Sequence, residues 1–131
     1  MTTLLRSAHF VVRHHLASCY VHLMRTEEPF LRHDVAARAL GACELALKGV
    51  DRSTTGILLD FRRAPMSTDP ELDKALAVRG DALIIPFARS AILVATHVGV
   101  MQADRISRTY SQTGTQIFHD EAVALRHVAG A

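Results

Sequence analysis

The chain has 131 residues, of which 49% are hydrophobic and 21% are charged, and its net charge is +2. These values are ordinary for one soluble globular domain and exclude an intrinsically disordered chain. The 15 basic and 13 acidic residues are scattered, so no basic run indicates a nucleic-acid or anionic-membrane partner. Aromatic residues make up only 5%, which argues against a platform for stacking bases.

Two features of the N-terminal half bear on where the protein works. Cys19 and Cys43 lie in apolar surroundings, as buried free thiols do in reduced cytosolic proteins; a disulfide is the less favoured alternative. The residues before Cys19 are similar to the end of a lipoprotein signal, but an arginine and two histidines at 13–15 interrupt the apolar core that export requires. No apolar stretch approaches the roughly twenty residues of a membrane helix. We therefore expect a soluble, cytoplasmic protein.

The first half of the chain predicts a hairpin and then a helix. β-branched and aromatic residues at 9–14, and alternating apolar residues at 18–24, indicate two strands that pair antiparallel. Pro29 fits the first turn of a helix that runs to about Lys48, where Gly49 supplies the stop. The expected inward face of this helix consists of apolar residues at helical spacing: Leu31, Val35, Ala39, Ala42 and Ala46.

The second half alternates strands with helices. Residues 57–61 and 91–95 are nearly continuous apolar runs, which is typical of strands buried on both faces of a parallel sheet. A short strand is expected at 115–118. Helices are expected between and after these strands, at about 68–85, 98–110 and 120–125.

The resulting order of elements is β-β-α-β-α-β-α-β-α. Strands that alternate with helices imply parallel pairing through right-handed crossovers. We therefore predict an α/β fold with a mostly parallel sheet of about five strands, an antiparallel N-terminal strand and four flanking helices. No linker or composition break divides the chain, so one domain is expected over 1–131, with an ordered core at about 8–128.

No pattern for metal binding, nucleotide binding or nucleophilic catalysis is complete. The eight histidines include no pair at the i, i+4 spacing of a helical zinc site, and Cys-x-x-Cys is absent. The sequence has neither a Gly-x-Ser-x-Gly elbow nor a glycine-rich phosphate loop. We therefore assign no catalytic residue, metal ligand or cofactor. An enzyme that uses Asp60 or His119 as a base is the least favoured alternative.

The segment 60–68 is the strongest candidate site. It follows a predicted central strand and leads into a helix, where open α/β sheets place their binding sites. The candidate contacts for a partner or ligand are Asp60, Arg62, Arg63 and Met66. Ser67 and Thr68 are candidate phosphorylation sites, because a helix N-terminus favours an anion with which nearby arginines can pair. The favoured interpretation is structural: Ser67 and Thr68 cap the helix, Asp60 ties down the loop and the arginines are solvated.

The order of elements, together with Gly56-Ile57-Leu58-Leu59-Asp60-Phe61, resembles the STAS superfamily, the fold of anti-sigma-factor antagonists. Residues 91–110 and the ending 117–125 resemble its SpoIIAA-like, or SEC14-like, branch of bacterial proteins. The resemblance covers about residues 8–128. It implies a parallel sheet wound with helices, an extra N-terminal strand and a non-enzymatic regulatory role. Where that family carries a phosphorylated serine in an Asp-Ser-Ser-Gly-like motif, this chain has Met66-Ser67-Thr68-Asp69-Pro70-Glu71 and lacks the pattern.

From this resemblance we expect a regulatory protein–protein interaction module, bacterial and cytoplasmic, that binds a regulatory protein or a second copy of itself. The alternative is a small-molecule or lipid-binding domain with a pocket at the carboxyl edge of the sheet. The related lipid carriers suggest it, as do Arg62 and Arg63 beside the apolar Phe61. An apolar surface patch flanking residues 60–72 indicates a protein contact, whereas an enclosed cavity indicates a ligand.

Overall fold

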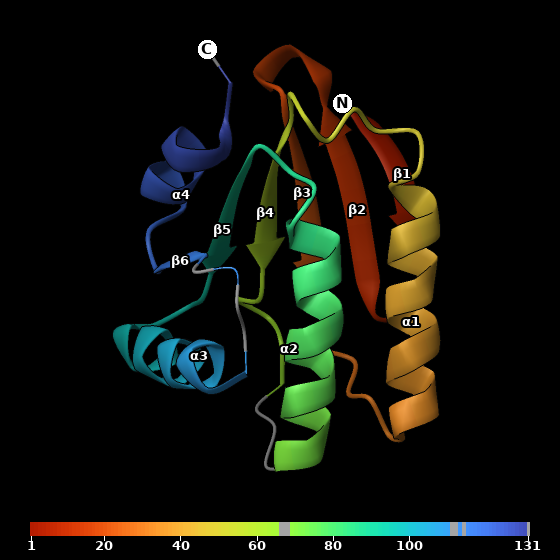
Figure 1. Ribbon diagram of the computed structural model, residues 1–131, viewed down its shortest axis with the longest axis vertical. Helices are drawn as coiled ribbons and strands as arrows, with labels where there is room; N and C mark the ends of the chain where they lie inside the picture. Colours follow the sequence, from red (N-terminus) through yellow and green to blue (C-terminus); the bar gives the residue numbers. More distant parts are fainter. Residues whose placement is uncertain (66–68, 111–112, 114, 131) are drawn as a thin grey trace.

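The computed structural model describes the whole chain except residues 66–68, 111–112, 114 and 131. The described residues form one six-stranded sheet, in which the order of the strands in space is their order in the chain (Figure 1). The first three strands pair antiparallel, and the last three continue from the third in parallel. The α/β prediction, with antiparallel N-terminal pairing and a parallel remainder, is confirmed. The strands are β1 Thr2–Arg6, β2 Phe10–His15, β3 Tyr20–Arg25, β4 Gly56–Asp60, β5 Arg89–Leu93 and β6 Gln116–Phe118.

Strand β1 is the one strand that the sequence pattern did not indicate. It pairs with β2 at the edge of the sheet, and its register shifts between Thr3 and Leu5. Such an irregularity breaks the alternation of inward and outward side chains by which a strand is recognised. Leu4 and Leu5 are neighbours in the sequence, yet both are half-buried against the core.

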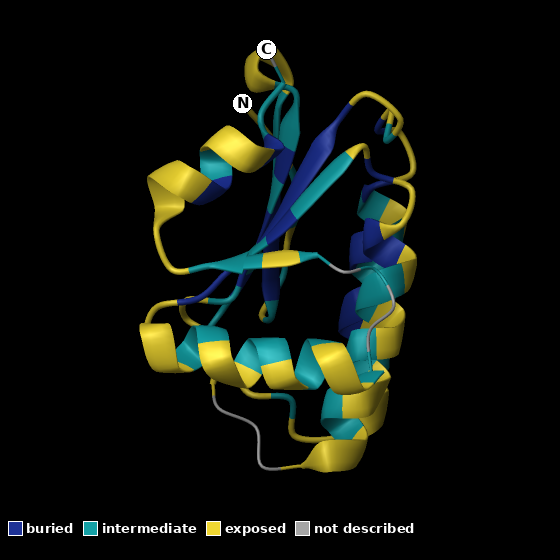
Figure 2. Ribbon diagram, turned by 60° about the vertical axis from the view of Figure 1, so that its left-hand side comes forward, coloured by how far each residue is buried: buried dark blue, intermediate teal, exposed yellow. Residues whose placement is uncertain are grey.

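Four α-helices cover the sheet: α1 His33–Ala46, α2 Pro70–Ile84, α3 His97–Tyr110 and α4 Glu121–Val128. Helices α1 and α2 lie on one face, and α4 lies on the other (Figure 1). Helix α3 crosses the carboxyl end of the parallel strands (Figure 2). None of these helices combines the length and the apolar character needed to cross a membrane.

Strands β4 and β5 occupy the interior of the sheet, as the apolar runs 57–61 and 91–95 predicted. Every residue of β4 is buried, and β4 lies between β3 and β5. Ile57 and Leu59 face the core beneath α1 and α2, whereas Leu58 packs with α4. This division follows from the period of two along a strand.

The expected start of the first helix is wrong, and its expected inward face is wrong at Leu31 but correct at Ala39. Helix α1 begins at His33 rather than Pro29, and Leu31 is 81% exposed. The preceding Phe30 is engaged in a tertiary contact, because its ring lies 4.0 Å from the guanidinium carbon of Arg25. The helix starts later than expected. Of the expected inward residues, Ala39 is buried and Val35, Ala42 and Ala46 are half-buried. The buried residues of α1 are Ala36, Ala39, Leu40 and Cys43.

Helix α2 is capped by Asp69. Its side chain accepts hydrogen bonds from the backbone N–H groups of Glu71 and Leu72, and Pro70 is the first helical residue. Proline suits that position because its missing N–H is not needed there. Ser67 and Thr68, which we expected as caps, lie outside the described residues.

Helix α4 is seated closely on the start of β4. A Cβ atom added at Gly56 would overlap the backbone carbonyl of Val128. The same carbonyl accepts a hydrogen bond from Arg89 Nε at 2.9 Å. Glycine at position 56 therefore allows the C-terminal end of α4 to approach the sheet.

We predict that Gly56→Ala lowers the free energy of unfolding by about 1–3 kcal/mol, because a backbone carbonyl must move to admit the methyl group. Gly41→Ala is the matched control, since a Cβ there meets nothing within 4 Å. In the interior of α1 this control should raise stability by about 0.5–1 kcal/mol. Urea denaturation of both variants measures the difference, and effects of the same sign would contradict the seating of α4 on Gly56.

Candidate functional site

Asp60, at the end of β4, is the centre of a polar network on the α4 side of the sheet. Its carboxylate is almost fully buried, and Oδ2 lies 2.8 Å from Nε2 of His22. Arg62 donates to the same carboxylate from Nη2 at 2.7 Å and from Nε at 3.0 Å. Its Nη1 donates to Glu121, the first residue of α4, at 2.6 Å. The network thus joins β3, β4, the loop after β4 and α4.

The charges within this network stabilise one another. Burial alone would raise the pKa of Asp60, but hydrogen bonds from His22 and Arg62 outweigh it and hold that pKa well below its ordinary value. The hydrogen bonds to Asp60 in turn raise the pKa of Arg62. Because an ionised carboxylate only accepts hydrogen bonds, Nε2 of His22 carries the proton in their contact. The carboxylate of Asp60 is therefore already hydrogen-bonded to residues of the same chain.

Arg63, the other described residue predicted for this segment, lies apart from Asp60. Nη2 of Arg63 is 3.5 Å from a carboxylate oxygen of Glu27, and both side chains are exposed. Met66, Ser67 and Thr68 lie outside the described residues. The alternative base, His119, is exposed, and its ring packs edge-on against His97. The structure brings Asp60 and Arg62 together and leaves Arg63 on a separate part of the surface.

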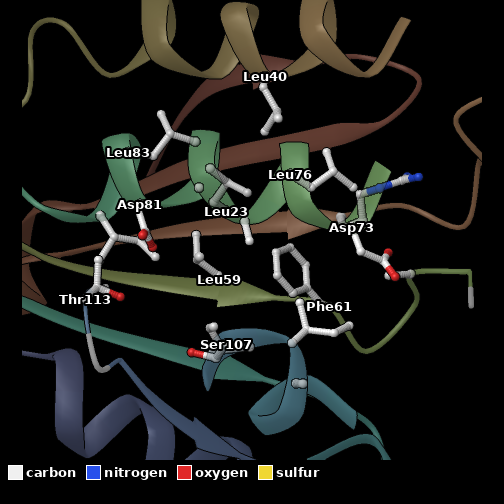
Figure 3. Close-up of a pocket in the computed structure, with 18 of the residues that line it drawn as sticks. Leu23, Leu40, Leu59, Phe61, Asp73, Leu76, Asp81, Leu83, Ser107 and Thr113 are labelled. Atoms are coloured by element: carbon white, nitrogen blue, oxygen red, sulfur yellow. The ribbon is translucent and has the colours of Figure 1, made fainter. Parts of the chain in front are cut away.

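A cavity of about 240 Å³ lies on the opposite side of the sheet from Asp60. It is bounded by the sheet, α1, α2 and α3, at the carboxyl end of β3 and β4. In Figure 3, Leu59 and Phe61 lie between Leu76 of α2 and Ser107 of α3. The wall is largely apolar, and its larger side chains include Phe10, Phe30, Leu59, Phe61, Leu76 and Ile106.

Two of the helices that wall this cavity, α2 and α3, bury few residues. Helix α3 contributes no buried residue, and on α2 only Leu83 and Ile84 are buried. Figure 2 shows α3 as partly and fully exposed along its whole length. The cavity therefore lies where two amphipathic helices meet the sheet without filling the space between them.

Arg25 is a charged residue in the wall of the cavity. It is 5% exposed, and its guanidinium lies over the rings of Phe30 and, at 5.7 Å, Phe10. Nη1 donates to the carbonyl oxygens of Thr26 at 2.8 Å and His9 at 3.4 Å. Burial lowers the pKa of Arg25, and Glu28 opposes this shift. A guanidinium nevertheless stays charged at neutral pH.

The alternation along β3 indicates a buried position for Arg25, which we did not predict. Val21 and Leu23 are the inward residues of β3, and both are buried. Continuing with the period of two places Arg25 on the same inward face. An arginine at a core position of a strand is unusual enough to mark a site.

No protein-family model, curated protein or solved structure matches this chain. Within the described part of the chain, no three His, Cys, Asp or Glu side chains are grouped so as to hold a metal ion. The function is therefore inferred from the geometry of the two sites above.

We predict that Asp60→Asn lowers the free energy of unfolding at pH 7 by about 2–3 kcal/mol, because it removes charge-assisted hydrogen bonds from a buried group. Asp34→Asn is the control: Asp34 also contacts two arginines, but its side chain is 58% exposed. Its loss should be much smaller, because exposed ion pairs are solvated and screened. Equal losses in urea denaturation would contradict the structural role of Asp60.

The stabilisation by Asp60 should also depend on pH with a defined sign. The folded-state pKa lies below the unfolded value of about 3.9, so the stabilisation is complete above that pH. It is lost as the pH falls from there toward the folded-state pKa. The difference in unfolding free energy between wild type and Asp60→Asn should therefore be largest near neutrality and shrink below about pH 4. A constant difference down to pH 3 would argue against an ionised Asp60.

Proposed function

We propose that this chain binds a small apolar molecule in the cavity between the sheet, α2 and α3. The observation that carries the proposal is the cavity itself, about 240 Å³ in volume and walled mainly by apolar side chains. Protein interiors are close-packed, with few voids larger than a water molecule. A pocket of this size with mainly apolar walls therefore offers a small apolar ligand a large surface to contact.

The position of the cavity supports the same function. Phe61 and Ala64, in the loop after β4, form part of the wall. Ligands of open α/β sheets bind outside the carboxyl ends of the strands, which is where this loop lies. Both residues fall within 60–72, the segment where we expected either an enclosed cavity or an apolar patch, and the cavity beside them is partly open to the surface.

The volume limits the size of the ligand. An apolar cavity of about 150 Å³ in another protein accepts benzene, which has six carbon atoms. Scaled in proportion, 240 Å³ corresponds to about ten non-hydrogen atoms. The ligand is therefore smaller than a membrane phospholipid and comparable with a short acyl chain or a substituted single ring.

The regulatory STAS-like interaction module expected from the sequence stays a prediction, and so does the absence of catalysis. Val98 and Met101 support a protein contact, because they lie one turn apart on α3 and are 62% and 63% exposed. Native mass spectrometry of freshly purified protein separates the two functions. A small molecule released from the folded monomer favours the cavity, whereas a dimer or a bound protein favours the interaction module.

We predict that 1-octanol binds to the wild-type protein, and that Ala77→Leu weakens this binding at least about tenfold, because the added side chain occupies the cavity. Ala75→Leu is the matched control, since Ala75 is exposed on the same helix and does not line the cavity. Isothermal titration calorimetry measures both affinities. If both variants bind octanol as the wild type does, the ligand site is not this cavity.

A further inference from the structure

Arg25 is buried and forms no ion pair with a described residue, although the exposed Glu28 acts on its charge from beyond ion-pair distance. None of the ion pairs between described residues includes it. The face of Phe30 and the carbonyl oxygens of Thr26 and His9 offset part of its charge. A fully buried cation ordinarily has an acidic partner as well, because desolvation of a charge is costly.

The unused donors of Arg25 form one edge of the guanidinium. Nη1 makes both hydrogen bonds to carbonyl oxygens, whereas Nε and Nη2 have no acceptor among the described residues. Nε–H and one Nη2–H are parallel, with a spacing that matches the two oxygens of a carboxylate. Since Arg25 also lines the cavity, a carboxylate bound there can complete the coordination of its charge.

Two acids also line the cavity, Asp73 and Asp81 of α2, and neither forms an ion pair with Arg25. They are eight residues apart, or about 12 Å along the helix, and lie at opposite sides of the view in Figure 3. Both are only half-buried, so water screens their charges better than it screens the charge of Arg25. Arg25 is therefore the most deeply buried charge among the described residues of the wall, and Glu28, whose charge also acts on it, is exposed to solvent. These positions favour an anion beside Arg25.

We infer that the ligand is an amphiphilic monocarboxylate whose carboxylate pairs with Arg25 while its apolar tail fills the cavity. This inference rests on the proposed function and specifies the class of ligand. Octanoate has ten non-hydrogen atoms, which matches the size derived from the cavity volume. Its tail lies against Leu59, Phe61 and Leu76, and the guanidinium is held over the rings of Phe30 and Phe10.

The test compares three ligands that share one tail: octanoate, 1-octanol and octylamine. By isothermal titration calorimetry at pH 7, the wild-type protein should bind octanoate at least about tenfold more tightly than octanol. Octylamine, protonated at this pH, should bind most weakly because it places a cation beside Arg25. Tighter binding of octylamine than of octanoate would show that the two acids control the site and would overturn the inference.

Variants then assign the preference to Arg25. Arg25→Met keeps the apolar contacts of the side chain and should lower octanoate affinity about tenfold or more without weakening octanol binding. Arg25→Lys keeps the charge but not the paired donors, and should give an intermediate octanoate affinity. Arg79→Met, at an exposed position of α2 outside the cavity, should change neither affinity. Thermal melts establish that each variant is folded.

The outcomes distinguish this inference from the proposed function on which it rests. If octanol and octanoate bind equally, and Arg25→Met changes neither, the cavity takes apolar ligands and the carboxylate assignment is wrong. If none of the three compounds binds to the wild-type protein, the proposed function fails together with the inference. Selective loss of octanoate binding in Arg25→Met supports both.

Discussion

The burial of β4 on both faces is the constraint on which the rest of the structure depends. Because side chains alternate along a strand, β4 must supply two different layers at once. Ile57 and Leu59 enter the layer beneath α1 and α2, while Gly56, Leu58 and Asp60 face α4. The residue type at each position of β4 is therefore restricted by the elements packed on the side that it faces. Gly56 leaves room for the C-terminal end of α4, and Asp60 ends the strand on the same side.

The two sides of the sheet have different physical character where β4 ends. On the α4 side, Asp60 is a buried charge, and the fold accommodates it by placing His22 and Arg62 within hydrogen-bonding distance. On the other side, Phe61 contributes to the wall of an apolar cavity. One side is closed and electrostatically satisfied, which suits a structural role. The other combines an apolar cavity with an arginine that forms no ion pair among the described residues, which is the arrangement from which we propose an anionic, apolar ligand.

The packing of α2 and α3 would connect binding of the proposed ligand to stability. These helices are held to the sheet through partly exposed faces, and α3 has no buried residue. A ligand that fills the space beneath them adds the contacts that the protein alone does not make. Any molecule that binds the folded state and not the unfolded chain stabilises the fold by mass action. The helices around the cavity are therefore the part of the structure on which a bound ligand has the largest local effect.

The sequence by itself determined the class of fold and the central strands. The runs at 57–61 and 91–95 were recognisable because burial on both faces leaves a local signature, a nearly unbroken series of apolar residues. Local patterns were misleading at two places. Pro29 predicted a helix start, but Phe30 contacts Arg25 and α1 begins only at His33. The irregular register of β1 obscured the alternation by which a strand is recognised.

Only the tertiary structure decided what the residues near the end of β4 do. The partners of Asp60 and Arg62 include His22, 38 residues before Asp60, and Glu121, 59 residues after Arg62. The cavity is likewise formed by side chains from several separate elements. That Arg25 lines it is visible only in the tertiary structure. Periodicity along a chain records which face of an element is buried. It does not record which distant side chains share that space, or whether they fill it.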